Sequence, residues 1–172
     1  ETNENYISMI REKENIQIEK HSEIKELRQL YPENMIIGHL NVNSFDMKYL
    51  EIKNMLLEGK LDALMLSETK LDNSFQNSLY EVNGYIMYRQ DKRSNSGGLL
   101  AYVSKDIPST SGPVNISTEN VECMSIELNV REHKILLVCM YTNPKMKPHD
   151  FKLFFENTCE KIFDEFDHVI II

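Results

Sequence analysis

Three apolar segments of this sequence each lead into a cluster of polar side chains. The segments are residues 35–40, 61–66 and 135–141, and the clusters are Asn41 to Ser44, Ser67 to Lys70 and Tyr141 to Pro144. Short apolar runs that end in polar and turn-forming residues are typical of buried β-strands. In layered α/β proteins, the ends of such strands often line the active cleft. We therefore expect the three clusters, although distant in the chain, to lie together in the fold.

The rest of the pattern mixes strands and helices without regular alternation. A helix is predicted over residues 47–58, with Asp46 as its N-terminal cap and Gly59 at its end. A second, amphipathic helix is predicted over residues 151–166. Further strands are predicted at residues 85–89, 99–104, 122–130 and 169–172, with a tight connection at 131–133 and a loop over 108–113. This mixture favours an α/β fold in which two sheets pack together and helices lie outside them.

The first part of the chain differs in composition from the rest. It is rich in charged side chains, contains no glycine and repeats apolar residues at helical spacing. We predict a charged helical N-terminal extension over residues 1–33, followed by the domain itself over residues 34–172. The chain begins at Glu1 and ends on the β-prone residues 169–172, so we expect the natural polypeptide to continue beyond it.

Charge and cysteine content narrow the functional classes. The net charge of −8 counts against nucleic-acid binding through the overall field of the protein. A metal-using nuclease can nevertheless be acidic, because the ion offsets carboxylates locally. No stretch is apolar enough to span a bilayer, so no membrane partner is expected. Three widely spaced cysteines predict free thiols and an intracellular setting, either nuclear or cytoplasmic.

The polar clusters contain a lone carboxylate framed by amides and a phenol. Glu68 follows the second apolar segment, Asn41 and Asn43 follow the first, and Tyr141 lies at the end of the third. This combination suits Mg²⁺ (or Mn²⁺) and a phosphate group, since magnesium needs only one or two carboxylates. Each residue also has a structural interpretation. Glu68 would then be a solvated strand-end residue, the asparagines turn formers and Tyr141 a residue at the edge of the core.

A small basic cluster lies at the end of the predicted strand 85–89 and in the loop that follows it. Arg89, Lys92 and Arg93 are close together in the sequence, and Tyr85 and Tyr88 stand beside them. Such a cluster can follow a phosphate backbone, and Arg89 and Arg93 are the candidate substrate-binding residues. The alternative is an ordinary solvated loop.

The order and spacing of several motifs point to a known family. The motifs are LNVNS at 40–44, LMLSETKL at 64–71, NGY at 83–85 with YRQDKR at 88–93, SGGLLAYV at 96–103 and VCMYTNP at 138–144. Together they resemble the apurinic-type endonuclease domain of non-LTR retrotransposons. This domain belongs to the endonuclease/exonuclease/phosphatase superfamily, and the likeness covers approximately residues 35–172.

The resemblance implies a four-layer α/β sandwich, in which two packed mixed sheets are flanked by helices. It implies that Glu68 binds Mg²⁺, that Asn41 helps to organise the metal and the phosphate, and that Tyr141 hydrogen-bonds the scissile phosphate. Asn43 matches a motif position and is assigned to substrate binding. The implied activity is nicking of target DNA, after which the 3′-hydroxyl primes a reverse-transcriptase domain in the same polypeptide.

The sequence also departs from the family pattern. The family continues with a GDFN motif and later an (S/T)DH triplet, and neither is present before Ile172. We therefore expect the fold to be incomplete at its C-terminus and the isolated chain to lack significant nuclease activity. Asn143 also replaces a residue that is usually proline. Two alternatives stay open: a degenerate, non-catalytic binding module, or another phosphodiesterase of the superfamily, such as a sphingomyelinase, inositol phosphatase or deadenylase.

Overall fold

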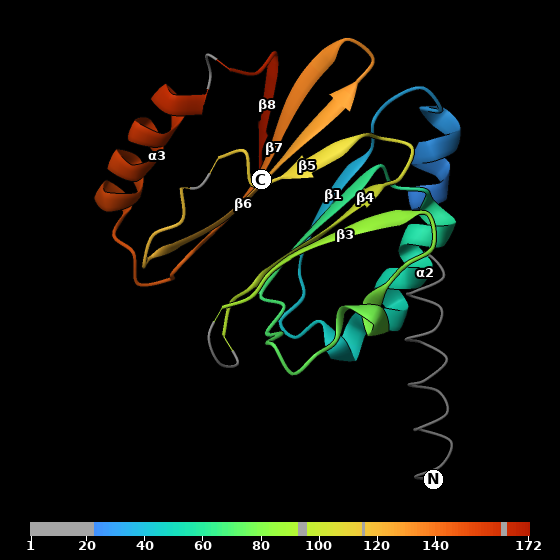
Figure 1. The fold of residues 1–172 in the computed structure, drawn as a ribbon, viewed down its shortest axis with the longest axis horizontal. Coiled ribbons are helices and arrows are strands. Elements are labelled where there is room, and N and C mark those ends of the chain that lie inside the picture. The colour runs from blue at the N-terminus through green and yellow to red at the C-terminus, as the bar shows by residue number, and fades with distance from the viewer. Residues whose placement is uncertain (1–22, 93–95, 115, 163–164) are drawn as a thin grey trace, which may run out of the picture.

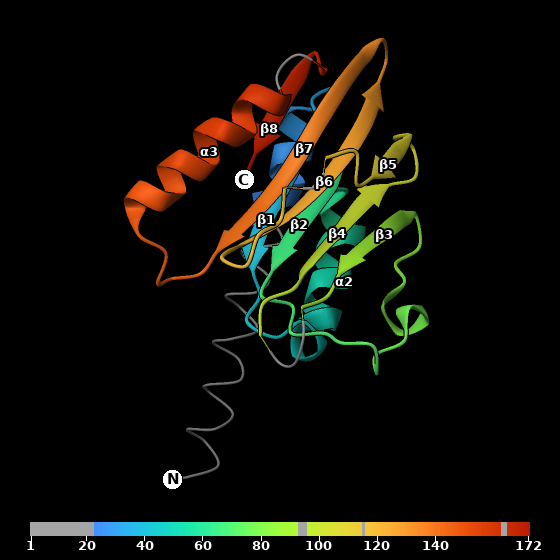
Figure 2. The same ribbon diagram turned by 60° about the vertical axis from the view of Figure 1, so that its left-hand side comes forward.

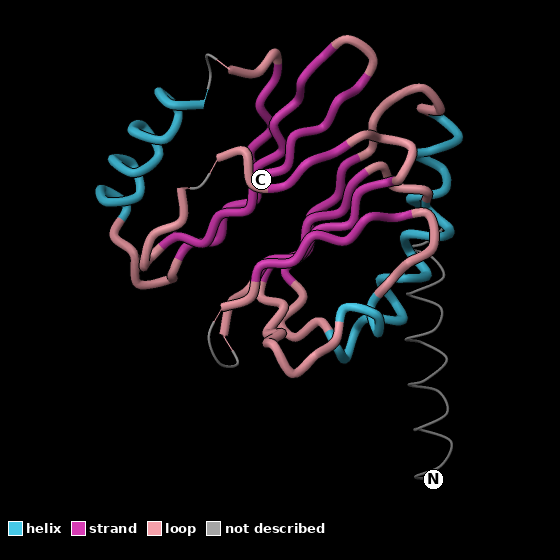
Figure 3. The backbone as a smooth tube through the Cα atoms, in the orientation of Figure 1, coloured by secondary structure: helices cyan, strands magenta, loops and turns pink. Residues whose placement is uncertain are grey.

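Two β-sheets pack face to face, and a helix lies outside each of them. The computed structural model describes residues 23–92, 96–114, 116–162 and 165–172. Helix α2 (Tyr49–Gly59) covers the outer face of the first sheet, and α3 (Pro148–Ile162) lies on the outer side of the second (Figures 1 and 3). The predicted fold class, two packed mixed sheets flanked by helices, is confirmed.

The first sheet has the strand order β1-β2-β4-β3 (Figure 2). Its strands are β1 (Ile37–Asn41), β2 (Ala63–Ser67), β3 (Tyr85–Gln90) and β4 (Leu99–Ser104). β1 and β2 are parallel, and the other neighbours are antiparallel. The parallel pair brings the C-terminal ends of two predicted strands to the same edge of the sheet, with Asn41 opposite Ser67.

The second sheet has the strand order β5-β6-β7-β8. Its strands are β5 (Ser109–Ser111), β6 (Val121–Val130), β7 (His133–Thr142) and β8 (His168–Ile171). β6 and β7 form the predicted hairpin, and β7 is parallel to β8. The register of the hairpin places Glu122 directly opposite Tyr141, so both side chains lie on the same face of this sheet.

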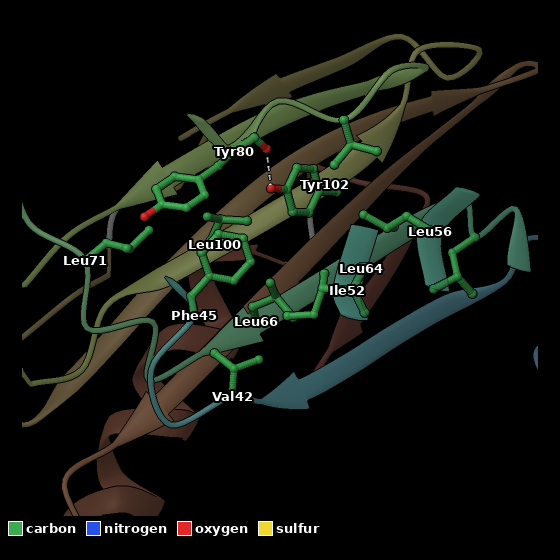
Figure 4. Packing of buried hydrophobic residues seen from close by; sticks show 12 residues of the cluster. Val42, Phe45, Ile52, Leu56, Leu64, Leu66, Leu71, Tyr80, Leu100 and Tyr102 are labelled. Atoms are coloured by element: carbon green, nitrogen blue, oxygen red, sulfur yellow. Dashed lines mark hydrogen bonds between the residues drawn. The ribbon is translucent and has the colours of Figure 1, made fainter. Parts of the chain in front are cut away.

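The two central strands of the first sheet, β2 and β4, are buried on both faces because they are apolar up to their final serine residues. On the inner face, Met65 and Ala101 pack against residues of the second sheet such as Ile126. On the outer face, Leu66 and Tyr102 join the cluster that packs beneath α2 (Figure 4). A strand covered on both faces has a continuous apolar sequence rather than an alternating one, as residues 63–66 and 99–103 do.

Helix α2 begins and ends differently from the prediction. Asp46 does not cap it: Asp46 lies in a 3-10 turn (Asp46–Lys48) and accepts a hydrogen bond from the Tyr80 hydroxyl at 2.7 Å. Gly59 is the last helical residue, and Lys60 adopts the left-handed conformation instead, with φ of 49°. Glycine is needed at 59 for close packing, since a Cβ there would lie 2.4 Å from Ile24 Cγ2.

Two short elements and the limits of the second helix differ from the prediction. β5 lies within the predicted loop, and a 3-10 turn covers Asn77–Tyr80. β5 is a three-residue strand of serine and threonine, so it carries no apolar pattern that could reveal it. The second helix begins at Pro148, three positions before the predicted start, and residues 165 and 166, which were predicted to be helical, are not.

The N-terminal segment is described from residue 23 onward, and residues 23–30 are helical. Arg28 anchors this helix by donating hydrogen bonds to Asp62 Oδ2 at 2.5 Å and to the Lys60 carbonyl at 2.8 Å. The helical prediction for residues 1–22 lies outside the described residues, and the predicted boundary after residue 33 stays a prediction. In the described part of the chain, no helix is long and apolar enough to cross a membrane.

A buried tyrosine provides a test of the outer core. Tyr102 is fully buried and donates a hydrogen bond to the Tyr80 carbonyl at 2.5 Å (Figure 4). Tyr102→Phe should lower the free energy of unfolding by about 1–2 kcal/mol, because the carbonyl loses its buried donor. Tyr31→Phe, at a residue that is 52% exposed, should change it by less than about 0.5 kcal/mol. Urea denaturation measures both values, and equal effects of the two substitutions would contradict this account.

Candidate active site

Two of the predicted site residues, Asn41 and Tyr141, contact the same carboxylate oxygen of a third, Glu68. Asn41, at the end of β1, donates a hydrogen bond from Nδ2 to Oε1 of Glu68 at 2.8 Å. Tyr141, near the end of β7, donates its hydroxyl hydrogen to the same oxygen at 2.7 Å. None of the described residues donates a hydrogen bond to the other oxygen, Oε2. The expected convergence of the three strand ends is therefore present, and one carboxylate oxygen is available to a ligand.

Two further side chains complete this group, which we call the Glu68 cluster: Asn41, Asn43, Glu68, Lys70 and Tyr141. The Asn43 backbone N–H donates to Asn41 Oδ1 at 3.2 Å, and the Lys70 ammonium donates to Asn43 Oδ1. Both polar atoms of the Asn41 amide are thus engaged, which fixes its orientation toward Glu68. Lys70 was not predicted as a site residue, although it stands only two positions after Glu68.

The backbone brings these side chains together by extending the β1–β2 pairing beyond the two strands. The Val42 N–H donates to the Ser67 carbonyl, and the Ser44 N–H donates to the Glu68 carbonyl, each at 2.9 Å. Residues 41–45 therefore run beside residues 67–69. This arrangement holds the Asn41 side chain next to the Glu68 carboxylate.

Three residues of the cluster, and Ser44 beside them, have an unusual backbone conformation. φ is positive at Asn43 (43°), Ser44 (92°), Glu68 (56°) and Lys70 (54°), although none of these residues is glycine. Such conformations are uncommon for residues with a Cβ, and backbone strain of this kind concentrates at functional sites. The turn at Glu68 directs its side chain to the rim of the sandwich, where Asn41 and Tyr141 meet it.

A glycine pair supports the strained segment from the other side. The Thr69 N–H donates to the Gly98 carbonyl at 3.1 Å, and the Lys70 N–H donates to the Gly97 carbonyl at 2.9 Å. In the sequence these two glycines stand out only as part of a strand motif. Their contact with the residues that follow Glu68 arises from the tertiary structure.

The hydrogen bonds determine the protonation states of the site. The Tyr141 hydroxyl first, and the Asn41 amide second, hold the pKa of Glu68 below its ordinary value of 4.5, and the nearby Lys70 ammonium acts in the same direction. The same bond to Glu68, together with burial, raises the pKa of Tyr141 to about 12. At neutral pH Glu68 is therefore a carboxylate, and Tyr141 is a protonated hydrogen-bond donor rather than a base.

The donor set suits a hard divalent cation that keeps most of its water ligands. Glu68 offers one open carboxylate oxygen, and the amide oxygen of Asn41 accepts one hydrogen bond, from the Asn43 N–H, which leaves its second lone pair. Within the described residues, no group of three or more His, Cys, Asp and Glu side chains could hold a metal ion. A zinc cage, which needs several nitrogen or sulfur ligands, is thus not formed there, whereas Mg²⁺ needs only one or two carboxylates.

Arg89 occupies a structural position. Its guanidinium forms an ion pair with Asp91 at 2.6 Å and donates to the carbonyls of Asp72 and Phe75 and to Asn77 Oδ1. All of its nitrogen atoms are engaged, so a phosphate could be bound only by exchanging one of these bonds. We interpret Arg89 as an anchor of the loop before β3. Arg93 lies outside the described residues, so its predicted substrate role stays a prediction.

The crowding at Gly98 gives a testable prediction for this site. A Cβ at Gly98 would lie 2.5 Å from Thr69 Oγ1, which is buried and has no hydrogen-bond partner among the described residues. Gly112 has a similar positive φ, 77° against 86° at Gly98, but a Cβ there would have no atom within 4 Å. Both alanine variants therefore adopt a strained backbone. Gly98→Ala should lower the free energy of unfolding by about 1–3 kcal/mol more than Gly112→Ala does, because only position 98 is overpacked. Thermal or urea denaturation of the two variants measures this difference, and equal destabilisation would argue against the contact.

The Tyr141–Glu68 hydrogen bond predicts a change in pH dependence. In Tyr141→Phe the carboxylate loses its strongest donor, so the pKa of Glu68 should rise toward 4.5. Since the folded-state pKa is lowered, the stability contributed by this bond is present above the unfolded-state pKa and is lost as the pH falls through the folded-state value. A titration of the Glu68 carboxyl by NMR measures the shift. Tyr88→Phe is the control, because the Tyr88 hydroxyl bonds Ser109 instead; an unchanged Glu68 pKa in Tyr141→Phe would contradict the geometry.

Comparison with known proteins identifies the fold. No protein-family model and no curated protein matches the sequence. Among solved structures, this chain is similar to a humanized D. rerio TDP2 (TM-score 0.61, 13% identity), to the endonuclease domain of TRAS1, a telomere-specific non-LTR retrotransposon (0.59, 14%), and to the 3′ phosphatase NExo from Neisseria (0.57, 18%). Each match covers 80% of this chain, which spans 64%, 57% and 56% of their respective lengths. The chain therefore shares the α/β sandwich fold of these three structures, which is the fold that the resemblance to the endonuclease/exonuclease/phosphatase superfamily predicted.

Proposed function

We propose that this chain carries the metal-binding and phosphate-binding residues of a divalent-metal-dependent DNA endonuclease of the non-LTR retrotransposon type. The observation that carries the proposal is the Glu68 carboxylate. Its Oε1 accepts hydrogen bonds from Asn41 and Tyr141, which belong to different sheets, and its Oε2 is open to a ligand within the described part of the chain. A structural strand-end carboxylate would need no such convergence from three distant parts of the chain.

In this proposal each residue of the Glu68 cluster has a role. Glu68 would hold Mg²⁺ (or Mn²⁺), with Asn41 fixing the carboxylate and offering its amide oxygen. When bound, such an ion supplies stabilisation of negative charge on a phosphate and its leaving oxygen. Tyr141, protonated at neutral pH, can transfer its hydrogen bond from Glu68 to a phosphate oxygen. Lys70, held by Asn43, adds a positive charge beside the same position, and Asn43 is assigned to the substrate side.

DNA is the substrate that the similar structures favour. NExo is bound to a product DNA hairpin, TRAS1 is a retrotransposon whose endonuclease domain is similar, and a further similar structure is a D. rerio TDP2 complexed with a single-strand DNA product (TM-score 0.59, 12% identity). The net charge of −8 works against binding through the overall field, so affinity for DNA would depend on the metal and on local cations. The finer proposal is nicking that primes a reverse transcriptase in the same polypeptide, in the nucleus or cytoplasm. A sphingomyelinase, inositol phosphatase or deadenylase would share the fold and differ in substrate.

The described cluster is not sufficient for rapid hydrolysis. It contains one carboxylate, no histidine and no group that is a base at neutral pH apart from Glu68, which the metal would occupy. General-base assistance commonly contributes about 10²–10⁴-fold to the rate, so a cluster without a base should be slow. We therefore propose that the 172-residue chain binds the metal ion but nicks DNA poorly by itself.

Metal binding and nicking provide the test of this proposal. The wild-type chain should bind Mn²⁺, as detected by electron paramagnetic resonance. Glu68→Gln should weaken that binding at least about tenfold, equivalent to about 1.4 kcal/mol, because it removes the single carboxylate of the cluster. Glu81→Gln, at an exposed position, is the matched control and should bind Mn²⁺ as wild type does.

The same proteins are assayed for nicking of supercoiled plasmid with Mg²⁺, and the nicking rate of the wild-type chain should not exceed that of Glu68→Gln. Equal Mn²⁺ affinity of wild type and Glu68→Gln would reject the metal site. Robust nicking by the wild-type chain would reject the proposed insufficiency of the cluster. DNA binding that is independent of both the metal and Glu68 would favour the non-catalytic binding module.

A further inference from the structure

A second carboxylate lies buried near the Glu68 cluster and has no part in the proposed chemistry. Glu122, at the start of β6, is only 8% exposed. Its Oε2 accepts the backbone N–H of Gly98 at 2.6 Å, and its Oε1 accepts the Lys92 ammonium at 2.9 Å. Burial of a carboxylate is costly unless it is paired and hydrogen-bonded, and these two donors offset the cost.

Glu122 joins the two sheets by a hydrogen bond next to the one that Tyr141 makes. It lies opposite Tyr141 in the β6–β7 register, so the two side chains leave the same face of the second sheet as neighbours. Tyr141 reaches Glu68 after β2, and Glu122 reaches Gly98 before β4. The rim of the sandwich that carries the cluster is therefore joined across the sheets at two adjacent points.

The two connections meet in the segment that carries Glu68. The carbonyls of Gly97 and Gly98 accept the N–H groups of Lys70 and Thr69, the two residues that follow Glu68. The Glu122 carboxylate also fills the space beside Gly97, where a Cβ would lie 2.2 Å from Oε1. Glu122 is thus connected to the backbone of the Glu68 turn through one tightly packed glycine pair.

We infer that Glu122 is a positioning residue for the Glu68 cluster: it holds Gly97–Gly98 so that their carbonyls keep the strained Glu68–Lys70 segment in place. The consequence for metal binding rests on the function proposed above, whereas the consequence for the backbone does not. The essential feature is an acceptor of the correct length for the Gly98 N–H. A glutamine can provide that acceptor, an aspartate is one methylene too short, and an alanine leaves the N–H buried without a partner.

Backbone exchange and metal affinity test the inference with four variants. In Glu122→Ala, the Thr69 and Lys70 amide hydrogens should exchange at least about tenfold faster than in wild type, and Mn²⁺ affinity should fall by a similar factor, each equivalent to about 1.4 kcal/mol. Glu122→Gln should keep amide exchange and Mn²⁺ affinity close to their wild-type values. Glu122→Asp should behave like the alanine variant, and it replaces that variant if Glu122→Ala does not fold. Glu127→Ala is the control, because Glu127 lies on the same strand and bonds Asn129 instead.

The possible results separate the inference from the proposed function. The inference would be overturned if the amide hydrogens of Thr69 and Lys70 exchanged at the wild-type rate in both Glu122→Ala and Glu122→Asp. Equal losses in Glu122→Gln and Glu122→Ala would also overturn it, since they would assign the effect to charge rather than to the acceptor. If wild type binds no Mn²⁺, the proposed metal site fails, and the amide exchange still decides whether Glu122 positions the segment.

Discussion

The site depends on the face-to-face packing of two sheets whose central strands have no polar face. β2 is buried along its whole length, and successive residues such as Met65 and Leu66 pack in different cores on its two sides. Polar side chains that follow such a strand can reach water only at the rim of the sandwich. The apolar sequence that drives the packing therefore also brings Glu68 and Tyr141, from different sheets, to the same rim.

The rim is held in a conformation that its local sequence would not adopt alone. Glu68 and Lys70 both have positive φ values, which cost free energy in residues with a Cβ. The cost is offset by backbone hydrogen bonds on both sides, from Ser44 to the Glu68 carbonyl and from Lys70 to the Gly97 carbonyl. Strain supported in this way fixes the carboxylate before any ligand arrives, which is the condition for a preorganised binding site.

The residues that sequence reasoning located differ physically from those it missed. The limits of β4, and the convergence of Asn41, Glu68 and Tyr141, follow from apolar runs and from where those runs end. The sequence did not reveal the structural position of Arg89, because its carbonyl and amide partners are 12 to 17 residues away in the chain. Its carboxylate partner, Asp91, is close in the sequence, but that pair alone does not show that the guanidinium is fully engaged. Glu122 was hidden for a related reason. An acidic residue in a strand normally faces water, and its burial depends on Lys92 and Gly98, which no local pattern connects to it.

The arrangement of hydrogen bonds keeps the Glu68 carboxylate charged while one of its oxygens accepts no hydrogen bond from the described residues. Tyr141 and Asn41 both occupy Oε1 and lower the pKa of Glu68, so the group is charged without being neutralised. Lys70 is the natural competitor for that charge, but its ammonium is held by Asn43 and does not close a salt bridge over Oε2. A lysine bonded directly to Glu68 would block the open oxygen, whereas a lysine held on a neutral amide leaves it accessible and adds a positive field for a phosphate. A carboxylate at position 43 would bind the Lys70 ammonium more strongly than the Asn43 amide does. Because Asn43 is neutral, it keeps Lys70 away from Glu68 and leaves both charged groups able to bind a ligand.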